Sequence, residues 1–142
     1  MIETSELKTY YKTGAQTQFA GKHLVKAVDG VSLKIERGKT LGLVGESGCG
    51  KTTFGRTLVG LIKPFSGSVF YDGTDIAGFD SAKLKNYRRR VQIVFQDPFS
   101  SLNPRMKIFS TVSEGLVVHK ISSGAGLRQR SLRLMEMVGL DP

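Results

Sequence analysis

The order of apolar and polar residues predicts several β-strands, most of them in the first half of the chain. Residues 25–35 alternate on both sides of Asp29-Gly30, a strand pattern interrupted by a turn signal. Residues 40–44 and 91–95 are continuous apolar runs, as expected of buried parallel strands. Strands are therefore predicted over residues 3–10, 25–35, 40–44, 67–71 and 91–95, with a loop at 12–23 and a turn at Asp72-Gly73.

Other segments carry apolar residues at helical spacing. Over residues 52–62, Phe54, Leu58 and Leu61 fall on one side, and Pro64 ends the helix. Helical patterns also cover residues 81–87, 106–120 and 127–138. Strands come first, then a glycine-rich loop leading into a helix, and finally a strand followed by helices. This order predicts an α/β fold with a parallel element.

A glycine-rich segment separates the apolar run at 40–44 from the helix at 52–62. It reads Gly45-Glu46-Ser47-Gly48-Cys49-Gly50-Lys51-Thr52 and matches the phosphate-binding pattern G-x-x-x-x-G-K-S/T in full. The backbone N–H groups of such a loop, with the positive end of the helix dipole, form a nest for an anion. The pattern directs Lys51 to the β- and γ-phosphates and the Thr52 hydroxyl to Mg²⁺. The phosphates of a nucleotide, with Mg²⁺, are therefore the expected ligand.

Length, composition and charge limit the classes of protein to which the chain could belong. The chain has 142 residues, enough for one ordinary domain, and no apolar stretch approaches the roughly 18 residues of a transmembrane helix. Its single cysteine, Cys49, excludes an internal disulfide. The net charge of +9 makes nucleic-acid binding one hypothesis. However, the densest basic cluster, Arg88-Arg89-Arg90, contains no interleaved aromatic residue for base stacking, so no nucleic-acid partner is expected.

The residues around the glycine-rich loop narrow the family. Residues 27–33 and 38–53, the Gly67-Ser68-Val69 strand, and Gln96 after the run at 91–95 resemble the opening of an ABC ATPase. Residues 94–106, VFQDPFSSLNPRM, are similar to the ATP-binding subunits of oligopeptide, dipeptide and nickel importers. The resemblance covers essentially the whole chain.

This resemblance implies a P-loop NTPase fold of the α/β class. Its parts are an antiparallel β subdomain, the P-loop strand and helix, the strand before the Q-loop, and the start of a helical subdomain, with an incomplete core sheet. The implied division of this partial ATP-binding domain, 1–142, is into residues 1–104 and 105–142. ATP and Mg²⁺ are the implied cofactors. The residues expected to bind the nucleotide are Gly45, Glu46, Ser47, Gly48, Cys49, Gly50, Lys51, Thr52 and Thr53.

The resemblance also implies roles outside the loop. Gln96, at the Q-loop position, would join Thr52 at Mg²⁺, sense the γ-phosphate and link the site to a transmembrane partner. An upstream aromatic residue would stack on adenine. Tyr11 and Phe19 are the candidates, with Tyr10 a further one, and their spacing does not choose between them.

The implied partners are transmembrane permease subunits and a second ATP-binding subunit, at the cytoplasmic face of the plasma membrane. Peptides are the expected substrate and nickel is an alternative. The 142 residues contain no LSGGQ-like segment, no apolar strand ending in Asp-Glu and no switch histidine. The chain is therefore expected to be an N-terminal fragment that does not hydrolyse ATP alone. The alternative is a non-hydrolysing nucleotide-binding remnant or regulatory module.

Overall fold

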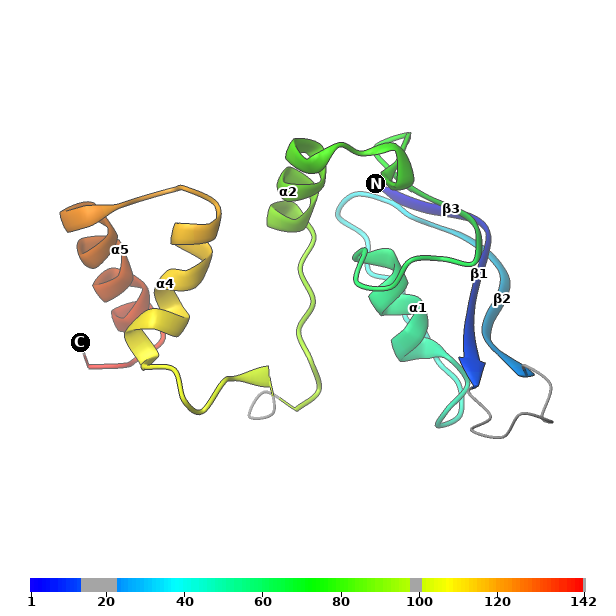
Figure 1. Cartoon of the computed structure of the whole chain (residues 1–142), viewed down its shortest axis with the longest axis horizontal. Coiled ribbons are helices and arrows are strands. Elements are labelled where there is room, and N and C mark those ends of the chain that lie inside the picture. Colours follow the sequence, from blue (N-terminus) through cyan, green and yellow to red (C-terminus); the bar gives the residue numbers. More distant parts are fainter. Residues whose placement is uncertain (14–22, 98–100, 142) are drawn as a thin grey trace, which may run out of the picture. The chain divides into compact units, whose positions relative to one another are not determined.

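An antiparallel sheet forms the first part of the chain in the computed structural model, which describes residues 1–13, 23–97 and 101–141. The strand order is β2-β1-β3-β4, and every neighbouring pair is antiparallel (Figure 1). The strands are β1 (Ile2–Thr13), β2 (His23–Ile35), β3 (Ser66–Tyr71) and β4 (Thr74–Asp75). The predicted strands at 3–10, 25–35 and 67–71 are confirmed, the first two as longer elements. The predicted loop at 12–23 loses its first two residues to β1 and its last to β2, and residues 14–22 lie outside the described part.

The turn predicted at Asp72-Gly73 joins β3 to β4. Asp72 and Gly73 both have positive φ, at 48° and 81°. Two consecutive left-handed residues match the right-handed twist of the strands on either side, which is why this dipeptide closes two-residue hairpins. The turn follows from local backbone preferences alone.

One helix covers a face of this sheet and completes a small core. Helix α1 (Lys51–Leu58) contacts β1 and β2 (Figure 1). Leu7, Val28 and Val69 from the strands meet Phe54 from the helix, and each is at most 6% exposed. Burial of a large apolar side chain contributes about 1.5–3 kcal/mol, so these contacts fix the start of α1 against β2.

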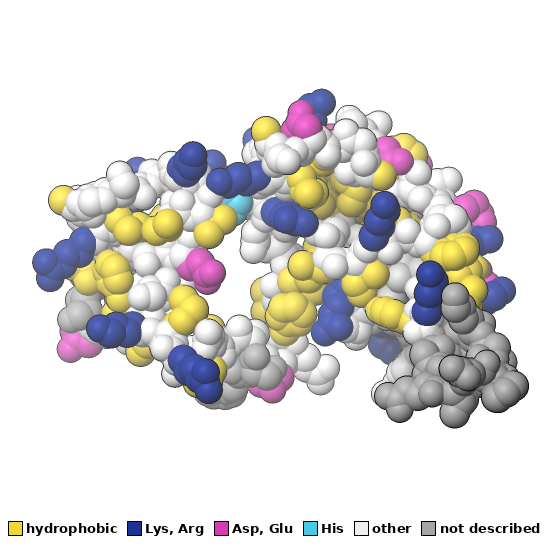
Figure 2. All heavy atoms as spheres, in the orientation of Figure 1, with side chains coloured by type: hydrophobic (Ala, Val, Ile, Leu, Met, Phe, Trp, Pro, Cys, Tyr) yellow, Lys and Arg dark blue, Asp and Glu magenta, His cyan; other side chains and the backbone are white. Residues whose placement is uncertain are grey.

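The apolar runs at 40–44 and 91–95 are not strands in this structure. Neither run pairs with a strand among the described residues. Val44 and Val94 are each 95% exposed, and Leu43 is 48% exposed. Figure 2 shows hydrophobic side chains gathered on the visible face of the sheet-bearing unit, between Lys and Arg side chains. A strand is defined by its neighbours, so an apolar run without a hydrogen-bonded partner stays irregular however strong its pattern.

The predicted helix at 52–62 ends earlier, at Leu58. The remaining helices are the short 3₁₀ helix η1 (Ile76–Gly78), α2 (Ser81–Arg90), α4 (Ile108–Val118) and α5 (Gly124–Met137). The last three confirm the other predicted helical segments with shifted ends, and η1 was not predicted. Asp80 caps α2, because its carboxylate accepts a hydrogen bond of 2.7 Å from the Lys83 N–H. None of the helices in the described ranges is long and apolar enough to cross a membrane.

The chain divides into two compact units, Met1–Ile93 and Val94–Pro142. The second unit is a hairpin of α4 and α5, which pack against each other (Figure 1). Ser113 on α4 and Ser131 on α5 are buried, and each hydroxyl donates to a carbonyl of its own helix. Internal bonding of this kind removes the cost of burying a hydroxyl.

Candidate nucleotide-binding site

The glycine-rich loop ends at the first turn of α1 with its backbone N–H groups uncapped. Gly48 and Gly50 have positive φ, at 81° and 100°, and no side chain caps the helix. Phe54 makes the first N–H bond into the helix, 2.8 Å from the Gly50 carbonyl. Before it, the Cys49 N–H donates to the Glu46 carbonyl in a long bond of 3.4 Å, which a charged phosphate oxygen can replace. The positive end of the helix dipole further favours an anion here.

Lys51 folds back over this loop. Its ammonium donates to the carbonyl oxygens of Gly45 and Glu46, at 2.7 and 2.5 Å, and lies 3.4 Å from the Cys49 sulfur. A cation held by two neutral carbonyls binds more strongly to the charged oxygens of a phosphate, which make shorter, stronger hydrogen bonds. The Lys51 side chain is thus placed for the phosphate contact that the motif predicts.

The loop is wedged against strand β2. A Cβ atom at Gly50 would lie 2.0 Å from the Ala27 carbonyl oxygen, far inside van der Waals contact. At Gly45, a Cβ atom would lie 2.8 Å from the Cys49 sulfur. The sequence did not predict Ala27 as the surface on which Gly50 packs. Ala27 belongs to the family-like segment 27–33, but no local pattern indicated this contact.

Tyr11 is brought next to the helix that follows the loop. Its hydroxyl lies 3.3 Å from the Thr53 hydroxyl, and the side chain is 41% exposed. Tyr10 is engaged elsewhere, because its hydroxyl donates to Asp29 at 2.5 Å and its ring stacks on Phe65 at 4.6 Å. Successive strand residues point to opposite faces, which separates these two tyrosines. Phe19, the other candidate for adenine stacking, lies outside the described residues.

A pocket of about 240 Å³ lies beside the loop. Val28 and Val31 of β2 and Phe54 of α1 supply apolar wall, while Gly50 and Lys51 supply polar surface. Its acidic residue, Asp29, has a lowered pKa, first because of the Tyr10 hydrogen bond and then because of Lys26. The remaining lining residues are Ala27, Asp29, Leu43, Val44 and Cys49.

The two predicted Mg²⁺ contacts lie in different units. The Thr52 side chain is exposed in the first turn of α1, in the first unit, whereas Gln96 is exposed in the second. No group of three His, Cys, Asp or Glu residues within the described ranges could hold a metal ion. The Thr52 hydroxyl supplies an oxygen that could ligate a metal ion, whereas the Lys51 ammonium and the loop N–H groups are hydrogen-bond donors that would bind phosphate oxygens. A metal ion at this loop would therefore take most of its ligands from the phosphates.

A helix that opens from a glycine-rich phosphate loop, packed on a β-sheet, defines the P-loop nucleotide-binding proteins. Comparison with known proteins narrows this class. Residues 28–141 match the family model described as ABC transporter, and the chain belongs to that family.

Several similar proteins are named as peptide transport proteins. The chain is 43% identical over 140 residues to the dipeptide transport ATP-binding protein DppF of Escherichia coli (strain K12), covering 99% of this chain and 42% of that protein. It is 46% identical, with the same coverage, to DppF of Haemophilus influenzae (strain Rd). It is 41% identical to the oligopeptide transport ATP-binding protein AppF of Bacillus subtilis (strain 168), covering 100% and 44%. The chain thus spans less than half the length of these curated relatives.

Solved structures support the fold. The ATP-binding cassette MJ0796, solved as a dimer in a post-hydrolysis state bound to ADP and Pi, superposes with a TM-score of 0.75 at 26% identity. The match covers 99% of this chain and 58% of that chain. The α/β fold of the N-terminal part of an ABC ATPase, expected from the sequence, is therefore confirmed.

Proposed function

We propose that these residues are the ATP-binding part of an ABC import system for peptides. The observation that carries the proposal is the Lys51 ammonium, which is bound by the Gly45 and Glu46 carbonyls of the loop that leads into α1. The relatives named as dipeptide and oligopeptide transport ATP-binding proteins support peptides as the substrate class.

Each residue of the proposed site has a separate task. The N–H groups from Gly48 to Thr52 bind the phosphates of ATP, and Lys51 neutralises charge at the β- and γ-phosphates. Thr52 directs its hydroxyl to Mg²⁺, which when bound supplies positive charge to the phosphate oxygens. Tyr11 stacks on adenine, and its place beside Thr53 favours it over Tyr10. The proposed nucleotide site further includes Gly45, Glu46, Ser47, Cys49, Gly50 and Thr53.

The proposal also covers the role of Gln96, the partner subunits, the two parts of the chain and its location. Gln96 senses the γ-phosphate with Mg²⁺ and links the site to permease subunits, and a second ATP-binding subunit completes the assembly. Residues 1–104 form the β subdomain and nucleotide core, and residues 105–142 begin the helical subdomain. The chain lies at the cytoplasmic face of the plasma membrane. Nucleotide binding is the activity we assign to these 142 residues, and ATP hydrolysis is assigned to the assembled transporter.

A binding measurement tests the nucleotide site directly. Binding of a fluorescent ATP analogue with Mg²⁺ is followed for the chain and for Lys51→Ala. A hydrogen bond to a charged group contributes about 1.5–3 kcal/mol, so affinity should fall at least about tenfold. Lys63→Ala is the matched control, because Lys63 is exposed beyond α1 and does not line the pocket beside the loop. Equal binding by Lys51→Ala, or no binding by the unmodified chain, would contradict the proposal.

A further inference from the structure

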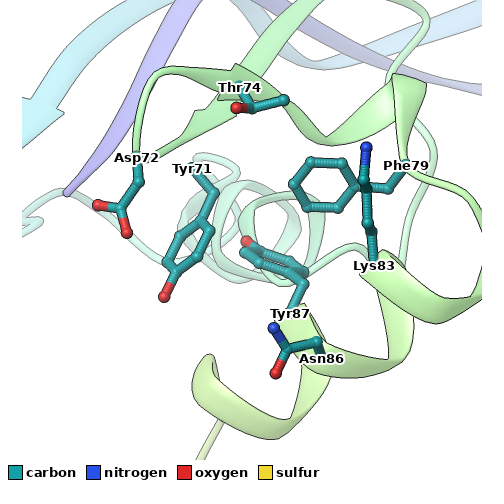
Figure 3. A pocket seen from close by; sticks show the side chains of 7 residues that line it. All are labelled: Tyr71, Asp72, Thr74, Phe79, Lys83, Asn86 and Tyr87. Atoms are coloured by element: carbon teal, nitrogen blue, oxygen red, sulfur yellow. The ribbon is translucent and has the colours of Figure 1, made fainter.

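A second pocket, of about 260 Å³, lies between the β3–β4 hairpin and α2, in the same unit as the P-loop but formed by other residues. We call it the α2 pocket. Figure 3 shows Tyr71 and Phe79 on either side of Tyr87. Both rings meet Tyr87 edge-on, with centroids 5.1 and 6.0 Å away. The other lining residues are Asp72, Thr74, Lys83 and Asn86.

The aromatic wall of the α2 pocket is fixed in place. Tyr87 is 1% exposed, and its hydroxyl donates to the Leu58 carbonyl at the end of α1. Burial raises the pKa of Tyr87 to about 12, so the hydroxyl stays protonated and keeps this bond at physiological pH. A rigid aromatic recess is the kind of feature that accepts one large apolar side chain of a partner.

The charge around the pocket is positive. Asp72, the one acidic residue among the described residues that line it, is already bound by two cations: the N-terminal amine at 2.8 Å and Arg37 at 2.6 Å. Lys83 takes part in no ion pair within the described residues. Asp72 therefore does not offset the charge of Lys83, and the rim of the pocket favours an anion.

Helix α2 extends this positive surface. Its five cations are all exposed, and none pairs with a carboxylate in the described part of the chain: Lys83, Lys85, Arg88, Arg89 and Arg90. Cations in the last turn are favoured by the helix dipole, but Lys83 and Lys85 lie before it. Lys85 also faces Arg88 and Arg89 three and four residues away, a spacing at which like charges repel. A bound anionic partner would relieve this repulsion.

We propose that the α2 pocket and the cations of α2 form a docking site for an acidic segment of a partner protein. The segment inserts one aromatic or large aliphatic side chain into the recess lined by Tyr71, Phe79 and Tyr87, and a flanking carboxylate binds Lys83 at its rim. A bilayer fits this surface less well, because a flat headgroup layer does not enter the recess. In addition, Leu84 and Tyr87 face the body of the protein, which leaves α2 without an apolar face to insert into lipid.

The test uses a blocked peptide in which one phenylalanine is flanked by glutamates. Binding to the 142-residue chain is followed by amide chemical shifts, with saturable changes expected around Phe79 and Lys83. Replacing the phenylalanine of the peptide by alanine, or introducing Lys83→Glu into the chain, should each weaken binding at least about tenfold. Thr74→Trp, at the exposed rim, should block the recess without disturbing the core.

Two control variants separate an effect at the α2 pocket from a general effect of charge or of the nucleotide site. Arg128→Glu on α5 changes the net charge as Lys83→Glu does, and Lys51→Ala removes the proposed nucleotide contact; both should bind the peptide like the unmodified chain. The proposal fails if the peptide does not bind, or if binding ignores its phenylalanine. It also fails if anionic phospholipid vesicles bind the chain in a Lys83-dependent manner while the peptide does not displace them.

Discussion

Gly50 lies directly against the backbone of Ala27, so closely that a Cβ atom at position 50 would come within 2.0 Å of the Ala27 carbonyl oxygen. The same glycine has a φ of 100°, a conformation that side chains rarely adopt. The loop that opens toward phosphate is therefore held between β2 on one side and α1 on the other. Its shape depends on a residue distant in sequence as well as on its own glycines.

Gly50→Ala should destabilise the chain by more than about 1 kcal/mol, because it adds backbone strain and a steric overlap. Urea unfolding measures the change. Gly55→Ala is the control: Gly55 lies inside α1 with open space around its Cβ position, so alanine there should stabilise by about 0.5–1 kcal/mol. Similar unfolding curves for the two variants would show that the contact with Ala27 does not constrain the loop.

Tyr11→Ala should weaken ATP binding by about 1–3 kcal/mol, the usual contribution of a ring stacked on a base. Binding of tripolyphosphate, which has no base, should be unchanged. The comparison uses displacement of a fluorescent nucleotide by each ligand. Tyr10→Ala is the matched control, because Tyr10 is engaged by Asp29 and Phe65. If Tyr11→Ala binds ATP normally, Phe19→Ala becomes the variant to measure.

Thr57→Val should cost more stability than Thr9→Val, although the two hydroxyls bond to each other at 3.1 Å. Thr57 also donates to the Thr53 carbonyl at 2.8 Å, so the proton shared between the threonines comes from Thr9. Thr57→Val leaves the buried Thr9 hydroxyl without its acceptor, at a cost of about 1–3 kcal/mol. Thr9→Val leaves Thr57 bonded. Equal losses in thermal unfolding would contradict this assignment.

Protonation of the Asp72 carboxylate should make the chain less stable in acid. Arg37 and then the N-terminal amine lower its pKa from 3.8 to about 2. A group with a lowered folded-state pKa contributes stability that is complete above about pH 4 and is lost as the pH falls through about 2. Asp72→Asn, which tolerates the left-handed turn, should flatten the pH dependence of the melting temperature in that window.

Arg37→Gln provides an independent check on the same ion pair. It leaves the turn sequence intact and should also weaken the acid dependence. The effect should shrink with added salt, because both partners are partly exposed. An unchanged pH profile for both variants would show that the pair does not form in solution.

Local chemistry made several features readable from the sequence. The phosphate loop was predicted from residues 45–52 because glycine, lysine and threonine act there through their own backbone and side-chain properties. The turn at Asp72-Gly73 and the helical segments depend on the same short-range preferences. These features need little information from elsewhere in the chain, and the structure shows the turn and the helices where they were expected.

Other features were decided by contacts between distant residues. The sequence left Tyr10, Tyr11 and Phe19 as equal candidates, and the pairing of β1 with β2 then directed Tyr10 to Asp29 and left Tyr11 beside Thr53. The α2 pocket was not predicted, because it joins a hairpin to a helix and its aromatic residues come from three different elements: β3, the end of η1 and α2. The apolar runs at 40–44 and 91–95 were predicted as strands, yet pairing requires a neighbour that no local pattern supplies.

The sequence by itself determined the chemistry of the loop, the presence of an α/β chain and its family likeness. The tertiary structure alone decided that Ala27 supports Gly50, which tyrosine lies beside α1 and where positive charge meets an aromatic recess. The physical reason is the distance along the sequence over which each effect acts. Backbone preferences and side-chain chemistry belong to single residues, whereas steric contact, burial and strand pairing belong to pairs of residues that only folding brings together.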